Sequence, residues 1–236
     1  MKKRIWELDA LRGLAIIGMV AAHLIYDLTE LFRVWEMKDP RLFYFVQDWG
    51  GVVFFVLSGI CVTIGSAPVK RGLVVFGCGL LISAVTAGMY LLQLADRGII
   101  IYFGVLHCLG LCMALWPVFR KCPTWLLAAL GAAMAAGGLF LMDQVRVGTW
   151  WLVPLGIQSH GFSSSDYFPL LPNLGYFLLG AVLGRTLYRK KESLLPRVNA
   201  QVPVLRFLCW CGRSSLWIYL LHQPVLAGII GLWMIL

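Results

Sequence analysis

An arginine, a histidine and an aspartate lie along one apolar stretch near the start of the chain, at Arg12, His23 and Asp27. Arg12 and His23 are eleven residues apart, so on an α-helix they lie about 20° apart around the axis and roughly 16 Å apart along it. Asp27 follows His23 by four residues and shares that face one turn farther on. Because ionisable side chains are costly inside a membrane-spanning helix, this polar stripe predicts a functional site.

Two interpretations of the stripe are open from the residues alone. A histidine can act as a general base or as a nucleophile, and a carboxylate such as Asp27 can orient its ring or raise its basicity. In the structural alternative, Arg12 pairs with Asp9 at the membrane boundary, and His23 and Asp27 satisfy one another inside a helix bundle.

Other polar side chains are expected at similar depths in other helices. A rise of 1.5 Å per residue places His107 near the depth of His23, and His222 near the midplane, where we expect it to be a packing residue. Together these depths predict a polar cavity that opens outward. The other residues expected to outline it are Ser58 and Asn173 and, towards its outer opening, Asp27 and Asp166.

The elements that position these side chains are predicted to be membrane-spanning helices. The chain has 236 residues, of which 60% are hydrophobic and 13% charged, whereas a soluble domain is about half apolar and a quarter charged. We therefore predict an all-α, polytopic helix bundle forming a single domain over residues 1–236. Its seven expected spans are 11–32, 49–66, 72–94, 99–119, 124–142, 169–188 and 214–235.

The distribution of cations predicts a cytoplasmic N-terminus. In that orientation 15 of the 20 Lys and Arg residues lie on the cytoplasmic side, which is the expected bias for a membrane protein. The net charge of +9 then needs no nucleic-acid partner. The protein is expected in the plasma (bacterial inner) membrane, in contact with the lipid bilayer, and a homo-oligomer is compatible with this arrangement.

The cysteines do not predict a metal site. Cys209 and Cys211 form a C-x-C pair, and Cys108 and Cys112 lie one helical turn apart, but neither pair has the four-ligand spacing of a zinc site. We expect ordinary buried thiols, no disulfide framework and no metal.

Several sequence strings resemble a known family in order along the chain. The string ELDALRGLAIIGMVAAH, from residue 7, resembles the first helix of transmembrane acyltransferases, in which a basic residue, ten intervening positions and a histidine follow one another. FFVLSG, from residue 54, resembles the second-helix signature of that group. Four further strings resemble the bacterial relatives of heparan-alpha-glucosaminide N-acetyltransferase: HLIYDL, FGVLHCLGL, DYFPLLPNLGYFLLG and GRSSLWIYLLHQP.

The resemblance implies a membrane acyltransferase that moves an acetyl group from cytoplasmic acetyl-CoA to an extracytoplasmic amino sugar, glycan or other amine. It implies His23 as base or nucleophile, Asp27 as its helper, and His107, with Asn173 or Ser58, as donor to the developing oxyanion. Acetyl-CoA is expected to be held by Arg12, Lys70, Arg71, Ser58 and Arg213, and the acceptor by Asp166 and Asn173.

Two other classes of function compete with the enzyme. A small-solute transporter or export partner could use the same polar cavity, and a non-catalytic membrane scaffold would need none of this chemistry. A transporter favours a duplicated architecture and a pathway that is polar from face to face. Here the polar residues are richest on one helix, which favours a catalytic funnel.

Overall fold

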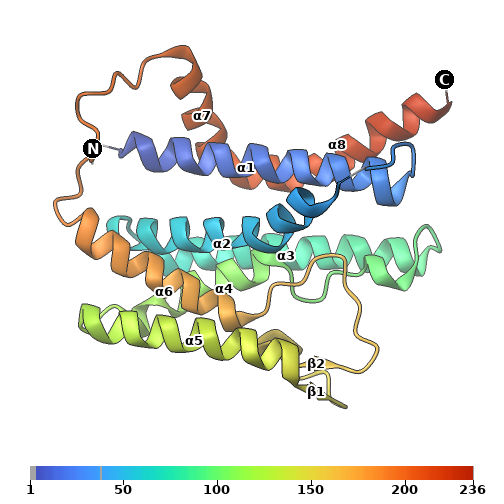
Figure 1. Ribbon diagram of the computed structural model, residues 1–236, viewed down its shortest axis with the longest axis horizontal. Coiled ribbons are helices and arrows are strands. Elements are labelled where there is room, and N and C mark those ends of the chain that lie inside the picture. Colours follow the sequence, from blue (N-terminus) through green and yellow to red (C-terminus); the bar gives the residue numbers. More distant parts are fainter. Residues whose placement is uncertain (1–3, 38, 236) are drawn as a thin grey trace. The chain divides into compact units, whose positions relative to one another are not determined.

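The computed structural model describes residues 4–37 and 39–235, and nearly all of its regular structure is helical (Figure 1). Beside the helices it has only two strands in the described chain, each of two residues and paired in parallel. The elements are α1 (Trp6–Tyr26), the π-helical turn η1 (Asp27–Leu31), α2 (Arg41–Ile64), α3 (Pro68–Leu91), the 3₁₀ turn η2 (Arg97–Ile99), α4 (Val105–Phe119), α5 (Thr124–Gln144), β1 (Arg146–Val147), the 3₁₀ turn η3 (Val153–Leu155), β2 (Gln158–Ser159), α6 (Leu170–Leu187), α7 (Pro203–Arg213) and α8 (Ser215–Ile235).

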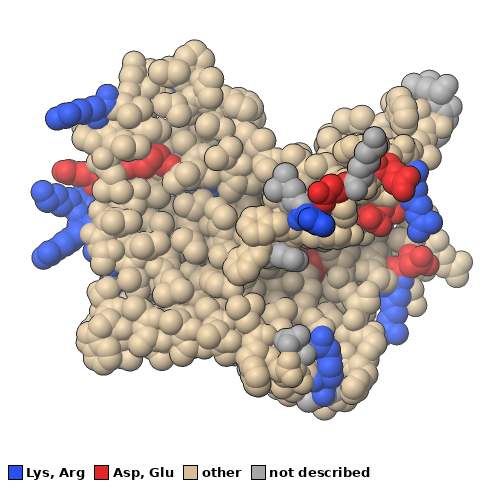
Figure 2. Space-filling view, in the orientation of Figure 1, with Lys and Arg blue, Asp and Glu red and all other residues tan. Residues whose placement is uncertain are grey.

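Six of the seven predicted membrane spans are confirmed as helices that could cross a membrane. In the described chain six helices are long and apolar enough to cross a membrane: α1 with η1, α2, α3, α5, α6 and α8; the apolar α4 is shorter. Most of the surface visible in Figure 2 carries no charge. The molecule is therefore an all-α, polytopic membrane protein.

The fourth span begins later than predicted. We expected a helix over residues 99–119, but α4 begins at Val105. The Asp166 carboxylate accepts a hydrogen bond from the Val105 amide, 3.1 Å away, and Phe103 pairs with Tyr167 in an isolated β-bridge. Contacts with a distant segment therefore hold the chain extended where local hydrophobicity predicted helix.

The described chain groups into two compact units. The first contains the described residues of 1–54 and 190–236, and the second contains residues 55–189. The first 14 residues of α2 belong to the first unit and its remainder to the second.

In the first unit, α7 and α8 pack against α1. Two glycines allow the closest approach: a Cβ atom on Gly13 would overlap the carbonyl oxygen of Leu208, and one on Gly212 would overlap that of Asp9. The start of α1 also holds the segment before α7, because the buried Glu7 carboxylate accepts hydrogen bonds from the Ser193 hydroxyl (2.8 Å) and the Leu194 amide (2.7 Å). The small helix α7, which the apolar spans did not predict, is thus part of the packed structure.

In the second unit, α3 packs on α4, and α5 on α6. The same device brings these helices together, since a Cβ on Gly72 would lie 2.6 Å from the Gly110 carbonyl oxygen. Between the last part of α2 and α6, a Cβ on Gly59 would overlap the Phe177 carbonyl, and one on Gly180 the Val56 carbonyl. Small residues therefore set the helix contacts of both units.

The contact between α1 and α7 predicts opposite effects for two Gly→Ala substitutions. Gly212→Ala forces α7 away from Asp9 and should destabilise the protein by roughly 1–3 kcal/mol. Gly228→Ala on α8 is the control, because a Cβ there meets nothing within 4 Å, and alanine favours a helix by roughly 0.5–1 kcal/mol. Thermal unfolding in detergent measures both. Equal midpoints for the two variants would contradict this packing.

Candidate functional site

The first helix changes its geometry at Asp27. From this residue the backbone forms a π-helical turn, in which the Phe32 amide donates to the Asp27 carbonyl over 2.8 Å. We expected a regular α-helix over residues 11–32, so the start at Trp6 and the wider turn at Asp27 are corrections. Such single π turns often occur at functional sites. Here the turn carries a fully buried carboxylate, with Asp27 0% exposed.

Two histidines of the first unit meet edge to face. The rings of His23 on α1 and His222 on α8 are 4.7 Å apart between centroids, at an interplanar angle of 83°. Nδ1 of His23 lies 3.0 Å from the Met19 carbonyl oxygen, and Nδ1 of His222 lies 2.6 Å from that of Tyr219. A carbonyl only accepts, so in the neutral form of each ring Nδ1 carries the hydrogen and Nε2 keeps its lone pair.

Asp27 is held from α8. The side-chain amide of Gln223 donates to Asp27 Oδ1 over 2.8 Å. Asp27 Oδ2, Gln223 Oε1 and His222 Nε2 are buried and have no hydrogen-bond partner among the described residues. All three are acceptors, and a buried acceptor without a donor is costly. The cluster of His23, Asp27, His222 and Gln223 is therefore suited to a ligand that brings N–H or O–H groups.

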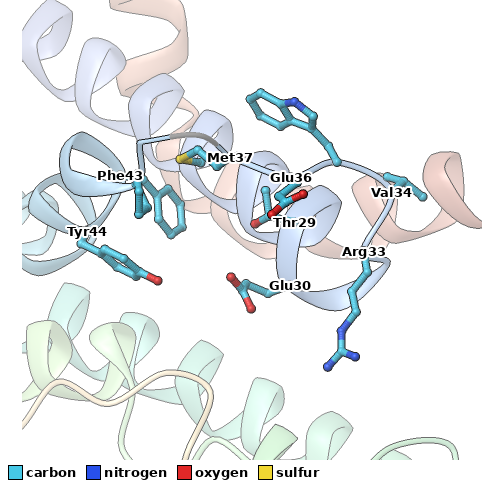
Figure 3. A pocket seen from close by; sticks show the side chains of 10 residues that line it. Thr29, Glu30, Arg33, Val34, Glu36, Met37, Phe43 and Tyr44 are labelled. Carbon is cyan, nitrogen blue, oxygen red and sulfur yellow. The ribbon is translucent and has the colours of Figure 1, made fainter.

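A cavity of about 520 Å³ lies beyond this cluster along the chain, in the segment from Thr29 to Tyr44. Its lining combines carboxylates, one guanidinium and aromatic rings. In Figure 3, Glu30 and the hydroxyl end of Tyr44 point toward one another across the opening. The size is that of a small-ligand pocket. The lining residues are Thr29, Glu30, Arg33, Val34, Trp35, Glu36, Met37, Pro40, Phe43 and Tyr44.

Two of the predicted CoA-binding arginines lie at one end of the first unit. Arg12 Nη1 is 3.4 Å from Asp9 Oδ1, the pairing that the structural interpretation of the stripe anticipated. Arg213 is exposed and follows Gly212, which abuts the Asp9 backbone. Arg12 and Arg213 therefore lie at the same level of α1, eleven residues or about 16 Å before His23.

In the second unit, both ring nitrogens of His107 are occupied. The Gly104 amide donates to Nδ1 over 3.2 Å, so this nitrogen keeps the lone pair and Nε2 carries the hydrogen. Nε2 lies 3.3 Å from the Ser83 hydroxyl, which itself donates to the Ile101 carbonyl over 2.5 Å. His107 is thus an N–H donor at the first turn of α4, whereas His23 and His222 present bare nitrogens.

The two predicted acceptor residues also lie in the second unit. The Asp166 carboxylate bonds to the first turn of α4 at Val105, where a helix N-terminus favours a negative charge. Asn173 is buried in the first turn of α6 and donates to the Pro169 carbonyl over 2.8 Å. Tyr167 follows Asp166 in the sequence, and its hydroxyl donates to the Val153 carbonyl over 2.6 Å. Burial raises the pKa of this hydroxyl.

The remaining predicted CoA residues are spread along α2 and α3. Ser58 is half-buried beside Gly59 at the contact with α6, and Lys70 and Arg71 are exposed in the first turn of α3. Arg71 folds back over Gly65, where a Cβ would overlap its guanidinium. His107 contacts α3 at Gly79, eight residues or about 12 Å beyond Arg71.

The thiols are free and provide no metal centre in the described chain. No group of three His, Cys, Asp or Glu side chains in that part of the protein could hold a metal ion. Burial raises the pKa of Cys209 and of Cys211, so both remain protonated and weakly reactive at neutral pH.

The last helix, α8, contributes more to the cluster than its sequence predicts. His222 was expected to be a packing residue, and Gln223 was not singled out, yet these two bring α8 to His23 and Asp27. A signal was present, because adjacent polar residues near the middle of an apolar span are costly unless they are partnered. Their partners became visible only in the packed helices.

Comparison with known proteins supports an assignment by family. The family model described as "Heparan-alpha-glucosaminide N-acetyltransferase, catalytic" matches residues 4–224, which is nearly the whole chain. No curated protein and no solved structure matches.

The bond between Asp27 and Gln223 predicts a non-additive pair of substitutions. Gln223→Leu leaves the buried carboxylate without its donor and should cost roughly 1–3 kcal/mol. The double variant Asp27→Leu/Gln223→Leu removes both polar groups and should be the more stable of the two. Thermal unfolding measures this, with the exposed Gln201→Leu as a neutral control. A double variant less stable than Gln223→Leu would argue against the pairing.

Proposed function

We propose a function from the family to which this chain belongs, the heparan-alpha-glucosaminide N-acetyltransferase catalytic family. In this proposal the protein moves an acetyl group from cytoplasmic acetyl-CoA to an amino sugar or other glycan outside the plasma membrane. The family membership and the apolar helices make it a membrane acetyltransferase. The donor, the acceptor, the membrane and the direction of transfer are proposals. The observation that carries them is the cluster of His23, His222, Asp27 and Gln223.

Acetyl-CoA enters from the side on which the cations gather. Its phosphates need charge-assisted donors, for which the candidates are Arg12 and Arg213 in the first unit and Lys70 and Arg71 in the second. Arg12 precedes His23 by about 16 Å along α1. This distance suits a ligand with an anionic head and a long, thin arm, because the head can remain at the membrane boundary while the thioester reaches the histidine.

His23 acts as the general base. The acceptor nitrogen or oxygen attacks the thioester carbonyl carbon, the new C–N or C–O bond forms, and the C–S bond breaks to release the CoA thiolate. His23 Nε2 takes the proton of the attacking atom, since Nδ1 is fixed by the Met19 carbonyl. The proton passes on to the thiolate and leaves with CoA, so the enzyme returns to its starting state.

Asp27 and the two α8 residues hold the acceptor. Their unpartnered atoms are all acceptors of hydrogen bonds, so they bind the N–H or O–H groups of the attacking molecule and direct it towards His23. The cavity from Thr29 to Tyr44 takes the rest of the acceptor. Its carboxylates and aromatic rings suit the amine and the ring faces of a sugar.

The second unit has candidates of its own, which the family resemblance suggests. His107 with Ser58 or Asn173 is the candidate donor to the developing oxyanion, for which its Nε2 hydrogen must leave Ser83. Asp166 and Asn173 are the candidates for acceptor binding. A transiently acetylated His23 is the alternative route, and it differs by labelling the protein when acetyl-CoA is supplied without acceptor.

Removing the base should abolish transfer. His23→Ala should lower kcat by roughly 10²–10⁴-fold with acetyl-labelled CoA and candidate amines. His160→Ala is the matched control, because that histidine is exposed in the loop before α6. If the wild type neither binds nor consumes acetyl-CoA, the proposed enzymatic activity is wrong. If the His23→Ala variant turns over at the wild-type rate, only the role of His23 as base is wrong.

Substitution of Arg12 should weaken the binding of acetyl-CoA without slowing the chemical step. Arg12→Gln removes a charge-assisted bond to the CoA phosphates, so the KM for acetyl-CoA should rise roughly tenfold while kcat is retained. Arg41→Gln is the control, since that side chain is 93% exposed at the start of α2. A fall in kcat at unchanged KM would place Arg12 in the chemical step instead.

A further inference from the structure

The helix α7 is too short to cross the membrane, and both of its neighbours place it at a membrane boundary. Its 11 residues span about 16 Å, against the roughly 30 Å of a hydrocarbon core. A single residue separates its end at Arg213 from the start of the membrane-spanning α8 at Ser215. It also packs on the first turns of α1, where Cys209 donates to the Trp6 carbonyl over 3.4 Å and Gly212 abuts Asp9.

The surface of α7 divides into three faces. The first, with Cys209 and Gly212, is buried against α1. The second is apolar and exposed: Val204 is 66% exposed, Phe207 56% and Trp210 54%, and the rings of Phe207 and Trp210 stack at 6.2 Å.

The third face of α7 is cationic. Arg206 and Arg213 are seven residues apart, so they lie about 20° apart around the axis, beside the apolar face. Both are exposed and neither forms an ion pair with a described carboxylate. An exposed apolar face bordered by arginines is typical of a helix that lies in a membrane interface.

The segment leading into α7 adds to this positive charge. Residues 190–213 contain five cations, Lys190, Lys191, Arg197, Arg206 and Arg213, against the single acidic residue Glu192. Glu7 anchors the segment to the start of α1 through Ser193 and Leu194. The cations are therefore held near the same membrane boundary as α7.

We propose that α7 lies in the headgroup layer and that the segment 190–213 binds anionic phospholipid. The apolar face enters the boundary of the acyl chains, and Lys190, Lys191, Arg197 and Arg206 contact the lipid phosphates, whereas Arg213 remains with the proposed CoA site. The charge of the segment selects anionic over zwitterionic lipid, because each basic residue near an anionic surface adds to the attraction. This surface is separate from the proposed catalytic cluster, and its function does not depend on acetyl transfer.

The test uses the full chain in vesicles of phosphatidylcholine with 20% phosphatidylglycerol, in which one lipid at a time carries brominated chains that quench tryptophan. The Trp210 signal is the difference between the wild type and Trp210→Phe. We expect quenching by shallow bromines to exceed quenching by deep ones. Brominated phosphatidylglycerol should quench about twofold more than its mole fraction predicts.

Removing cations from the segment 190–213 distinguishes recognition of anionic lipid from burial of α7 in the bilayer alone. The triple variant Lys190→Gln/Lys191→Gln/Arg206→Gln should return phosphatidylglycerol quenching to its mole fraction. The control Arg41→Gln/Arg97→Gln/Arg146→Gln removes three charges from other segments and should retain the excess. If Trp210→Phe fails to fold, Trp210→Tyr supplies the reference for the same difference, because it keeps an aromatic ring against Phe207.

Three outcomes would overturn the proposal. Quenching of Trp210 by neither lipid means that water or a protein partner covers the apolar face, and cross-linking at residue 204 distinguishes these two. Quenching in proportion to mole fraction removes the selection of anionic lipid. Loss of the excess in the control variant as well assigns it to net charge rather than to this segment.

Discussion

The burial of one carboxylate in an apolar helix is the constraint on which much of the first unit depends. Asp27 is fully buried, so its polar atoms need partners within the protein. Gln223 satisfies one oxygen, and this requirement brings α8 alongside α1 at that depth. The same approach sets the rings of His23 and His222 edge to face. A single polar requirement thus positions three other side chains.

The helices reach these positions because glycines remove side chains at the crossings. Gly13 and Gly212 let α1 and α7 approach until backbone meets backbone. In the second unit Gly72 and Gly110 do the same for α3 and α4, and this contact keeps Ser83 within reach of His107. In a bilayer, where hydrophobic association between helices is weak, close van der Waals packing of this kind determines which polar residues can meet.

The histidines illustrate how one residue type takes different chemical states. In His23 and His222 a carbonyl of the same helix accepts from Nδ1 and leaves Nε2 as a base. In His107 an amide donates to Nδ1, so Nε2 becomes a donor. The difference comes from position: His107 lies in the first turn of α4, where amides are free, whereas the other two follow a complete turn of helix.

The sequence by itself determined the all-α membrane class, most of the spans, the family and the face shared by Arg12 and His23, because hydrophobicity, length and helical periodicity are local properties. It did not determine the π turn at Asp27. Nor did it determine the late start of α4 or the helix α7, since Asp166 acts on α4 and the α1 backbone on α7 from far along the chain. Only the tertiary structure decided that Asp27 pairs with Gln223 and His23 with His222. Those partners are almost 200 residues apart, and packing rather than spacing brings them together.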